Sequence, residues 1–337
     1  MTNLKTNYLG LELKNPVVVG ANDMVMNVEN LARMEEAGAA AVVFKSLFEE
    51  QIQLESLEMD EQMNEYADRN AEMTSLFPGI EHAGPQEHLM GVRKAREKLS
   101  IPLIASLNAV NTETWLEYAK LLEDTGVDAL ELNFYAVPRE ANLKGEDIIE
   151  EQVKVLKEIK GSVSIPVSVK LSPFYANPLN VIARMDETGV DGFVLFNRLF
   201  QPEIDLETEK HVSRFPLSGE EDSKLPLRFA GLIYGNINAS ICSNTGIQDG
   251  LDVARMILAG ADCIQVVGAL YKHRIGHIAK MLKDLSGWME KKKYKSLREF
   301  RGRLSDKQTN DPYVYKRAQY VEMLLNSEKI FRTGSQV

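Results

Sequence analysis

Polar side chains recur in this sequence at the points where short apolar runs end. A buried lysine or amide is costly in free energy unless it has a partner, so core packing alone does not explain them. One asparagine could be an ordinary turn residue, but the whole set predicts the lining of a site for a flat ring with polar edges. The set comprises Gly20-Ala21-Asn22, Lys45-Ser46, Asn108, Asn133, Lys170, Asn197, Asn244-Thr245-Gly246 and Gly268.

Two turns late in the chain indicate where a negatively charged group would bind. Thr245-Gly246 comes just before a helix expected to start near Gln248, and Val267-Gly268 comes just before the last helix. Backbone N–H groups at such turns, beside a helix N-terminus, bind phosphate. Either turn alone is equally consistent with a plain strand-to-helix connection. Combined with the amide lining they predict a phosphorylated planar cofactor, for which FMN is the natural candidate. No GxGxxG dinucleotide motif follows a strand.

The elements that position these residues repeat along the chain. Four segments end a helix at a glycine and begin an apolar strand two or three residues later, and the glycines are Gly38, Gly126, Gly189 and Gly260. Four further strands are predicted at 15–22, 100–108, 164–172 and 237–246. Their continuous apolar runs are typical of parallel strands covered on both faces. About eight such units over about 250 residues predict an α/β fold, a (β/α)8 TIM barrel, with a doubly wound sheet as the alternative.

The expected organisation is a single domain with additions to the barrel. The barrel would occupy 1–290, and a helical C-terminal extension packed on it would occupy 291–337. The segments 47–84 and 199–226 are too long for simple loops, so we expect them to be insertions on the top face, the first reaching over it.

Composition excludes several classes of protein. The chain has 337 residues, a net charge of −10 and a pI of about 5.2, which argues against binding to nucleic acids or anionic membranes. It has no apolar run of membrane-spanning length and no signal-peptide pattern, so a cytoplasmic protein is expected. Cys242 and Cys263 lie within predicted strands and are expected to be core residues, and no cysteine–histidine cluster has the spacing of a metal site.

The same polar residues lie in short motifs whose order is informative. "FKS", "SLN", "ELNF", "VSVKLSP" and "TGIQDGLDVARMILAGADCIQVVGALYK" follow one another between Tyr8 and Lys272. In order and spacing they resemble the motifs of the dihydroorotate dehydrogenase family, and in particular of the dihydroorotate dehydrogenase-like proteins with a C-terminal extension. The resemblance implies an FMN-binding flavoprotein, an oxidoreductase acting on a CH–CH bond, and a connection with pyrimidine metabolism.

The resemblance also implies which residues contact FMN. Lys170 would lie beside the pyrimidine edge of the flavin, where an ammonium group stabilises the negative charge that develops on reduction. Asn133 and Asn197 would bind the substrate as well. The full set implied for the cofactor is Gly20, Ala21, Lys45, Ser46, Asn108, Asn133, Lys170, Asn197, Thr245, Gly246, Val267 and Gly268.

The sequence departs from the family at the residue that removes a proton from the substrate carbon. The family has a cysteine or serine three residues after the asparagine of "ELNF", and this chain has Ala136, which cannot accept a proton. Two substrate-binding asparagines of the family fall on Leu76 and Pro138. We therefore expect the flavin half of the site to be kept and the orotate half to be lost, so that dihydroorotate is a poor substrate.

Which residue replaces the missing base stays open. Tyr135 and Arg139 flank the alanine, and Glu81 and His82 lie on the loop expected to cover the flavin. Tyr135 is favoured because its hydroxyl could reach a substrate from the strand end, although it could equally form an aromatic wall.

Three functions are compatible with these observations. The first is an FMN-dependent oxidoreductase acting on a small planar substrate. The second is a flavoprotein without the family's turnover that serves as an electron-transfer or interaction partner. The third is a Schiff-base lyase or aldolase of the same barrel class, using Lys170 or Lys45. Because the sequence has neither an iron–sulfur cysteine pattern nor a hydrophobic N-terminal helix, we expect a soluble redox partner protein, and we expect a homodimer.

Overall fold

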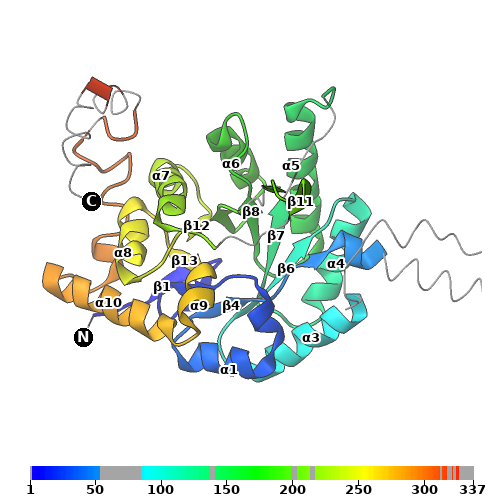
Figure 1. Cartoon of the computed structure of the whole chain (residues 1–337), viewed down its shortest axis with the longest axis horizontal. Helices are drawn as coiled ribbons and strands as arrows, with labels where there is room; N and C mark the ends of the chain where they lie inside the picture. Colours follow the sequence, from blue (N-terminus) through cyan, green and yellow to red (C-terminus); the bar gives the residue numbers. More distant parts are fainter. Residues whose placement is uncertain are drawn as a thin grey trace, which may run out of the picture.

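Parallel strands form a closed barrel in the computed structural model, which describes residues 2–53, 85–134, 136, 141–198, 203–212, 217–311, 313–316, 321 and 324–325 (Figure 1). The barrel closes where β4 pairs with β6, and a short strand, β5 (Leu47–Phe48), pairs with the far end of β6. All eight predicted strands are present, so the predicted (β/α)8 barrel is confirmed. They are β3 (Val17–Val19), β4 (Ala41–Val43), β6 (Leu103–Asn108), β7 (Ala129–Phe134), β8 (Val167–Leu171), β9 (Gly192–Leu195), β12 (Ser240–Asn244) and β13 (Cys263–Val266).

Helices surround the barrel and connect its successive strands (Figure 1). The helices expected before Gly38, Gly126, Gly189 and Gly260 are present, whereas α7 (Lys224–Ile233) begins inside the segment taken for the second insertion. Its third residue is Pro226, and proline is tolerated in the first turn of a helix. The helices are α1 (Val28–Glu36), α3 (Pro85–Lys98), α4 (Thr112–Glu123), α5 (Gly145–Ser162), α6 (Pro178–Asp186), α7 (Lys224–Ile233), α8 (Gly250–Ala259), α9 (Gly268–His273) and α10 (His277–Lys292).

The predicted helix-ending glycines have the backbone conformation that this position requires. Gly38, Gly126, Gly189 and Gly260 have φ angles of +105°, +82°, +80° and +138°. Side chains disfavour this region, so glycine ends each helix and the next strand can begin within a few residues. At the opposite ends, Asn27 and Asp249 accept hydrogen bonds from backbone N–H groups of α1 and α8.

The N-terminal hairpin closes the lower end of the barrel. It consists of β1 (Thr6–Tyr8) and β2 (Leu11–Leu13), and the N–H of Leu9 donates to Ser240 Oγ at the start of β12. A Cβ added to Gly192, the first residue of β9, would lie 2.4 Å from the Leu9 side chain, so glycine is required there. Cys242 and Cys263 are buried in the apolar cluster above this hairpin, which confirms their prediction as core residues.

The additions to the barrel are described in part. The second insertion contains the hairpin β10 (Glu203–Asp205) and β11 (Lys210–Val212), whereas residues 54–84 of the first lie outside the described residues, as does most of 312–337. A 3-10 helix, η4 (Leu297–Glu299), and turns follow α10. The division into a barrel and an extension stays a prediction. Of the helices that the structure describes, none has the length and apolar character needed to cross a membrane.

A buried histidine on α3 packs beneath the strand end that carries Lys45. His88 is 2% exposed, and its ring packs edge-on against Phe44 with 5.4 Å between centroids. Burial, and to a lesser extent the charge of Lys45, lowers the pKa of His88 to about 4. Since an unfolded histidine titrates near pH 6.5, the unfolded chain binds a proton between pH 6.5 and 4 that the folded chain does not. The neutral histidine therefore contributes stability above pH 6.5 that is lost as the pH falls toward 4.

We predict that His88 makes the free energy of unfolding fall by roughly 3 kcal/mol between pH 6.5 and pH 4, because each pKa unit corresponds to about 1.4 kcal/mol. Denaturant unfolding at a series of pH values should show a shallower fall for His88→Leu than for the wild type. His211→Leu, which changes an exposed histidine of β11, is the control and should keep the wild-type pH dependence. Parallel profiles for His88→Leu and the wild type would contradict the prediction.

Candidate functional site

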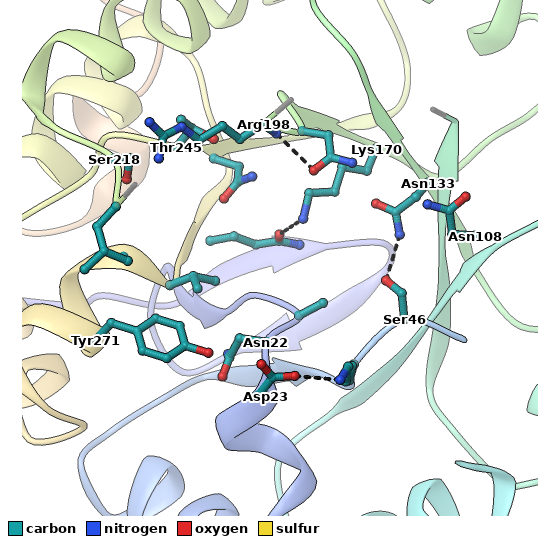
Figure 2. Close-up of a pocket in the computed structure, with 18 of the residues that line it drawn as sticks. Asn22, Asp23, Ser46, Asn108, Asn133, Lys170, Arg198, Ser218, Thr245 and Tyr271 are labelled. Atoms are coloured by element: carbon teal, nitrogen blue, oxygen red, sulfur yellow. Dashed lines mark hydrogen bonds and ion pairs between the residues drawn. The ribbon is translucent and has the colours of Figure 1, made fainter. Parts of the chain in front are cut away.

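A cavity of about 510 Å³ lies where the carboxyl ends of the barrel strands meet. This size is typical of small-molecule sites, and this end of a (β/α)8 barrel is where its sites are found. The predicted cofactor residues converge on it from separate strands, as Figure 2 shows for several of them. All line it except Gly20, which lies directly behind, since a Cβ there would come 2.9 Å from the Val267 side chain. Their role in binding stays a prediction.

Lys170 at the end of β8 provides a fixed positive charge in the cavity. Its Nζ lies 3.3 Å from Glu131 Oε1 and 3.2 Å from Gln265 Oε1, and Gln265 Nε2 in turn donates to Glu131. Glu131 is fully buried within β7, and Gln265 lies within β13. The three side chains thus satisfy one another across the barrel interior, which holds the ammonium group in place.

Asn133 is oriented by two serines of neighbouring strand ends. Its Nδ2 donates to Ser106 Oγ at 2.7 Å and to Ser46 Oγ at 3.1 Å, and the two hydroxyls are themselves 2.7 Å apart. Because the amide nitrogen is engaged in this buried cluster, the position of the whole side chain at the cavity wall is fixed. Figure 2 shows Asn133 and Asn108 together on the side of the cavity opposite Thr245.

The two predicted phosphate turns lie at the other end of the cavity, and their glycines pack closely against the segment 218–223. A Cβ added to Gly246 would lie 2.2 Å from the backbone nitrogen of Ser223, and one added to Gly268 would lie 2.9 Å from Ser218 Oγ. Thr245 and Gly246 both have positive φ angles, +78° and +77°. This is strained for a β-branched residue, and Thr245 is held by donation from its Oγ1 to the carbonyl of Phe196 at 3.0 Å.

Several residues of the cavity were missed by the sequence reasoning. Lys45 pairs with Asp23 at 2.6 Å, and burial raises the pKa of the nearby Tyr271. Asp23 and Arg198 could have been found, because each directly follows a predicted strand-end asparagine. The cavity residues outside the predicted cofactor set are Asn22, Asp23, Phe48, Glu50, Val110, Arg198, Leu217, Ser218, Asn244, Ile247, Gln265 and Tyr271.

Among the positions where the sequence departs from the family and the residues that could replace its base, only Ala136 is described. This alanine is exposed, three residues after Asn133. Tyr135, Arg139, Pro138, Leu76, Glu81 and His82 lie outside the described residues, so the identity of any replacement base stays a prediction.

The geometry fits the predicted cofactor. The cavity has a fixed ammonium and oriented amides at one end and a backbone cradle at the other, which suits a polar-edged ring carrying a phosphate. In the part of the chain that the structure describes, no group of three acidic, histidine or cysteine side chains could hold a metal ion.

Comparison with known proteins agrees with this geometry. The family model described as dihydroorotate dehydrogenase matches residues 3–289. The chain is 28% identical over 314 residues to the catalytic subunit of dihydroorotate dehydrogenase B (NAD(+)) of Thermoplasma volcanium, which covers 90% of this chain and 98% of that protein. It is 28% identical over 283 residues to the same subunit of Methanocaldococcus jannaschii, covering 80% and 87%. It is 27% identical over 300 residues to dihydroorotate dehydrogenase A (fumarate) of Lactobacillus delbrueckii subsp. bulgaricus, covering 84% and 93%.

We predict that the buried charges of Lys170 and Glu131 depend on each other. Lys170→Met leaves a buried carboxylate without its counter-charge and should lower the free energy of unfolding by about 3–5 kcal/mol. The double variant Lys170→Met/Glu131→Gln removes both charges and should recover most of this loss, because the amide oxygen that replaces the carboxylate can still accept from Gln265. Denaturant unfolding at pH 7, without added flavin, measures both.

The control for this pair is the exposed ion pair between Lys5 and Glu12, 2.7 Å apart. Lys5→Met should change stability little, because water solvates the remaining carboxylate. Equal instability of the single and double variants at the buried pair would show that the carboxylate does not need the lysine.

Proposed function

The chain belongs to the dihydroorotate dehydrogenase family, and we propose that it oxidises a CH–CH bond of a planar substrate other than dihydroorotate. Members of this family are FMN-dependent oxidoreductases acting on CH–CH donors, and FMN is the cofactor of this chain as well. The observation that supports the proposal is that the residue three after Asn133, where the resemblance puts the family's proton-abstracting residue, is the exposed Ala136. A methyl group cannot take a proton from a substrate carbon, so the proposed oxidation needs a base from another residue, for which Tyr135 is the candidate that the sequence favours.

Different residues of the cavity would bind different parts of the cofactor. When bound, FMN accepts the hydride. Lys170 would keep a positive charge at the ring, held by Glu131 and Gln265, where reduction places negative charge. Asn133, fixed by its two serines, would present its carbonyl oxygen to the ring or the substrate. The backbone N–H groups at Thr245-Gly246 and Val267-Gly268 would bind the phosphate.

A second function is favoured by the same alanine. A flavoprotein that has lost the family's turnover and passes electrons to a soluble partner protein needs no base at this position. The relatives compared differ in the electron acceptor that their names state, which is NAD(+) for two of them and fumarate for the third. Flavin reduction by a panel of reduced pyrimidines and nicotinamide nucleotides separates the two functions, because only an oxidoreductase of small molecules reacts with one of them. A homodimer stays a prediction.

The Schiff-base lyase is not supported. That chemistry needs a lysine amine free to attack a carbonyl. Lys170 is engaged by Glu131, and Lys45 pairs with Asp23. The chain also belongs to a family of FMN-dependent oxidoreductases, which supports flavin chemistry over a Schiff base.

Dihydroorotate is predicted to reduce the bound flavin slowly or not at all. A positioned base contributes roughly 10²–10⁴ in rate. Leu76 and Pro138, where the resemblance puts two of the family's asparagines, would offer no partner to the polar edge of orotate. Anaerobic stopped-flow mixing, with loss of flavin absorbance as the signal, measures the rate. Dithionite, which reduces the flavin without a binding site, is the control.

Fast reduction by dihydroorotate at ordinary concentrations would refute this prediction and would require another base in the site. Ala136→Cys alone should not restore the reaction, because the two other positions remain apolar. If this single change did restore it, the base and not the substrate pocket would be what the chain lacks.

Lys170→Met/Glu131→Gln is predicted to bind a flavin that is harder to reduce than in the Glu131→Gln single variant. Removing the fixed ammonium removes the charge that stabilises the reduced ring. The midpoint potential, measured by dye equilibration, should therefore be more negative in the double variant. Lys154→Met, which alters an exposed lysine of α5, should leave the wild-type potential unchanged. Equal midpoint potentials in the single and double variants would show that Lys170 does not stabilise the reduced flavin.

A further inference from the structure

The phosphate end of the cavity carries a cationic side chain that lies outside the predicted cofactor set. Arg198 follows Asn197 beyond the end of β9 and lines the cavity together with Thr245 and Ser218. In Figure 2 its side chain extends toward Thr245 and Ser218, away from Asn133. Arg198 therefore lies at the end of the cavity near Thr245, and Lys170 lies at the end near Asn133.

The backbone that carries Arg198 is bonded to the phosphate turn. The carbonyl of Phe196 accepts from Asn244 Nδ2 at 2.9 Å and from Thr245 Oγ1 at 3.0 Å. The N–H of Arg198 donates to Asn197 Oδ1 at 3.0 Å. These hydrogen bonds fix the backbone of residues 196–198 relative to the turn at Thr245. The Arg198 side chain therefore starts from a fixed position beside that turn.

The guanidinium group meets the wall of the same turn. Arg198 Nη2 lies 3.8 Å from Asp222 Oδ2. Asp222 accepts from the N–H of Gly219 at 2.8 Å, and its carbonyl carbon would lie 2.7 Å from a Cβ at Gly246. The guanidinium is therefore held at the segment that packs directly on the phosphate cradle.

The negative charges of a bound phosphate and of the Asp222 carboxylate would repel each other unless a cation lies between them. A phosphate monoester carries a charge of about −1.5 to −2 near pH 7, and the Asp222 carboxylate stands close to the turn that would hold it. Backbone N–H groups supply partial charges only. An arginine has five N–H donors in a rigid fork, so one guanidinium can face a carboxylate and a phosphate at the same time.

We propose that Arg198 binds the phosphate of FMN through its guanidinium group, with Asp222 as the positioning residue. This inference rests on the proposed function, because it takes FMN as the occupant of the cavity. It adds to the backbone cradle a side chain that recognises the phosphate by charge, so the site discriminates FMN from riboflavin. An anionic group of a substrate is the alternative partner for Arg198, and the experiment distinguishes the two.

The experiment compares two flavins that differ only in the phosphate. The full-length protein, freed of flavin, is titrated with FMN and with riboflavin, and the dissociation constants are read from flavin fluorescence. Arg198→Gln should weaken FMN roughly 10- to 100-fold, which is the range expected for losing a charged hydrogen bond, and should leave riboflavin unchanged. Arg198→Lys keeps the charge but not the fork, so its loss for FMN should be smaller.

The control variant is Lys224→Gln, which removes an exposed positive charge from the same wall, where Lys224 pairs with Glu221. It should bind both flavins as the wild type does. Unchanged riboflavin affinity shows that the arginine variants are folded.

Two outcomes would overturn the proposal. Equal weakening of both flavins by Arg198→Gln would make Arg198 a structural residue. Unchanged affinity for both would assign the guanidinium to some other anion, such as a substrate. Failure of the wild type to bind either flavin would instead refute the proposed function, so the two failures are distinguishable.

Discussion

A lysine ammonium buried between a carboxylate and an amide links three strands at the cavity end of this barrel, and the arrangement of the site depends on it. Lys170, Glu131 and Gln265 come from β8, β7 and β13, and their hydrogen bonds cross the barrel interior. Taking two charges out of water is expensive, and a buried ion pair is often no more stabilising than apolar residues of the same volume. Stability alone therefore does not explain the triad. Its position at the wall of the cavity does, because the triad holds an ammonium group where a bound ligand would meet it.

The remaining features of the site follow from placing that charge at one end. In the proposed orientation the phosphate of the cofactor would lie at the opposite end, beside Gly246 and Gly268, where the chain packs too closely for a side chain. The strained Thr245 belongs to this end, and its hydroxyl ties it to Phe196 of the β9 segment. The same segment brings Asn197 and Arg198 into the cavity. One strand end thus couples the ring side of the site to the phosphate side.

The sequence contained most of the fold because its signals are local. A glycine that ends a helix and the apolar run that follows it lie within a few residues, so each strand could be placed without knowing its neighbours. The partners of Lys170 had no such signal. Glu131 and Gln265 are 134 residues apart in the chain and lie inside apolar strands, where only barrel closure shows that they face the same interior. Helix α7 was missed for another reason, since the segment 199–226 was assigned as one insertion by its length and the helix begins inside it at Lys224.

The contrast between the two halves of the site limits the chemistry that it can perform. Oxidation of a carbon acid removes a hydride and a proton, so it needs both a flavin and a base. Oxidation of a reduced nicotinamide removes a hydride alone, and transfer of electrons to a partner protein moves no carbon-bound proton. The cavity keeps Lys170, the oriented Asn133 and the phosphate cradle, while Ala136 offers no base. Oxidation of any CH–CH donor at this site therefore needs a proton acceptor other than Ala136, whereas electron transfer to a partner protein does not.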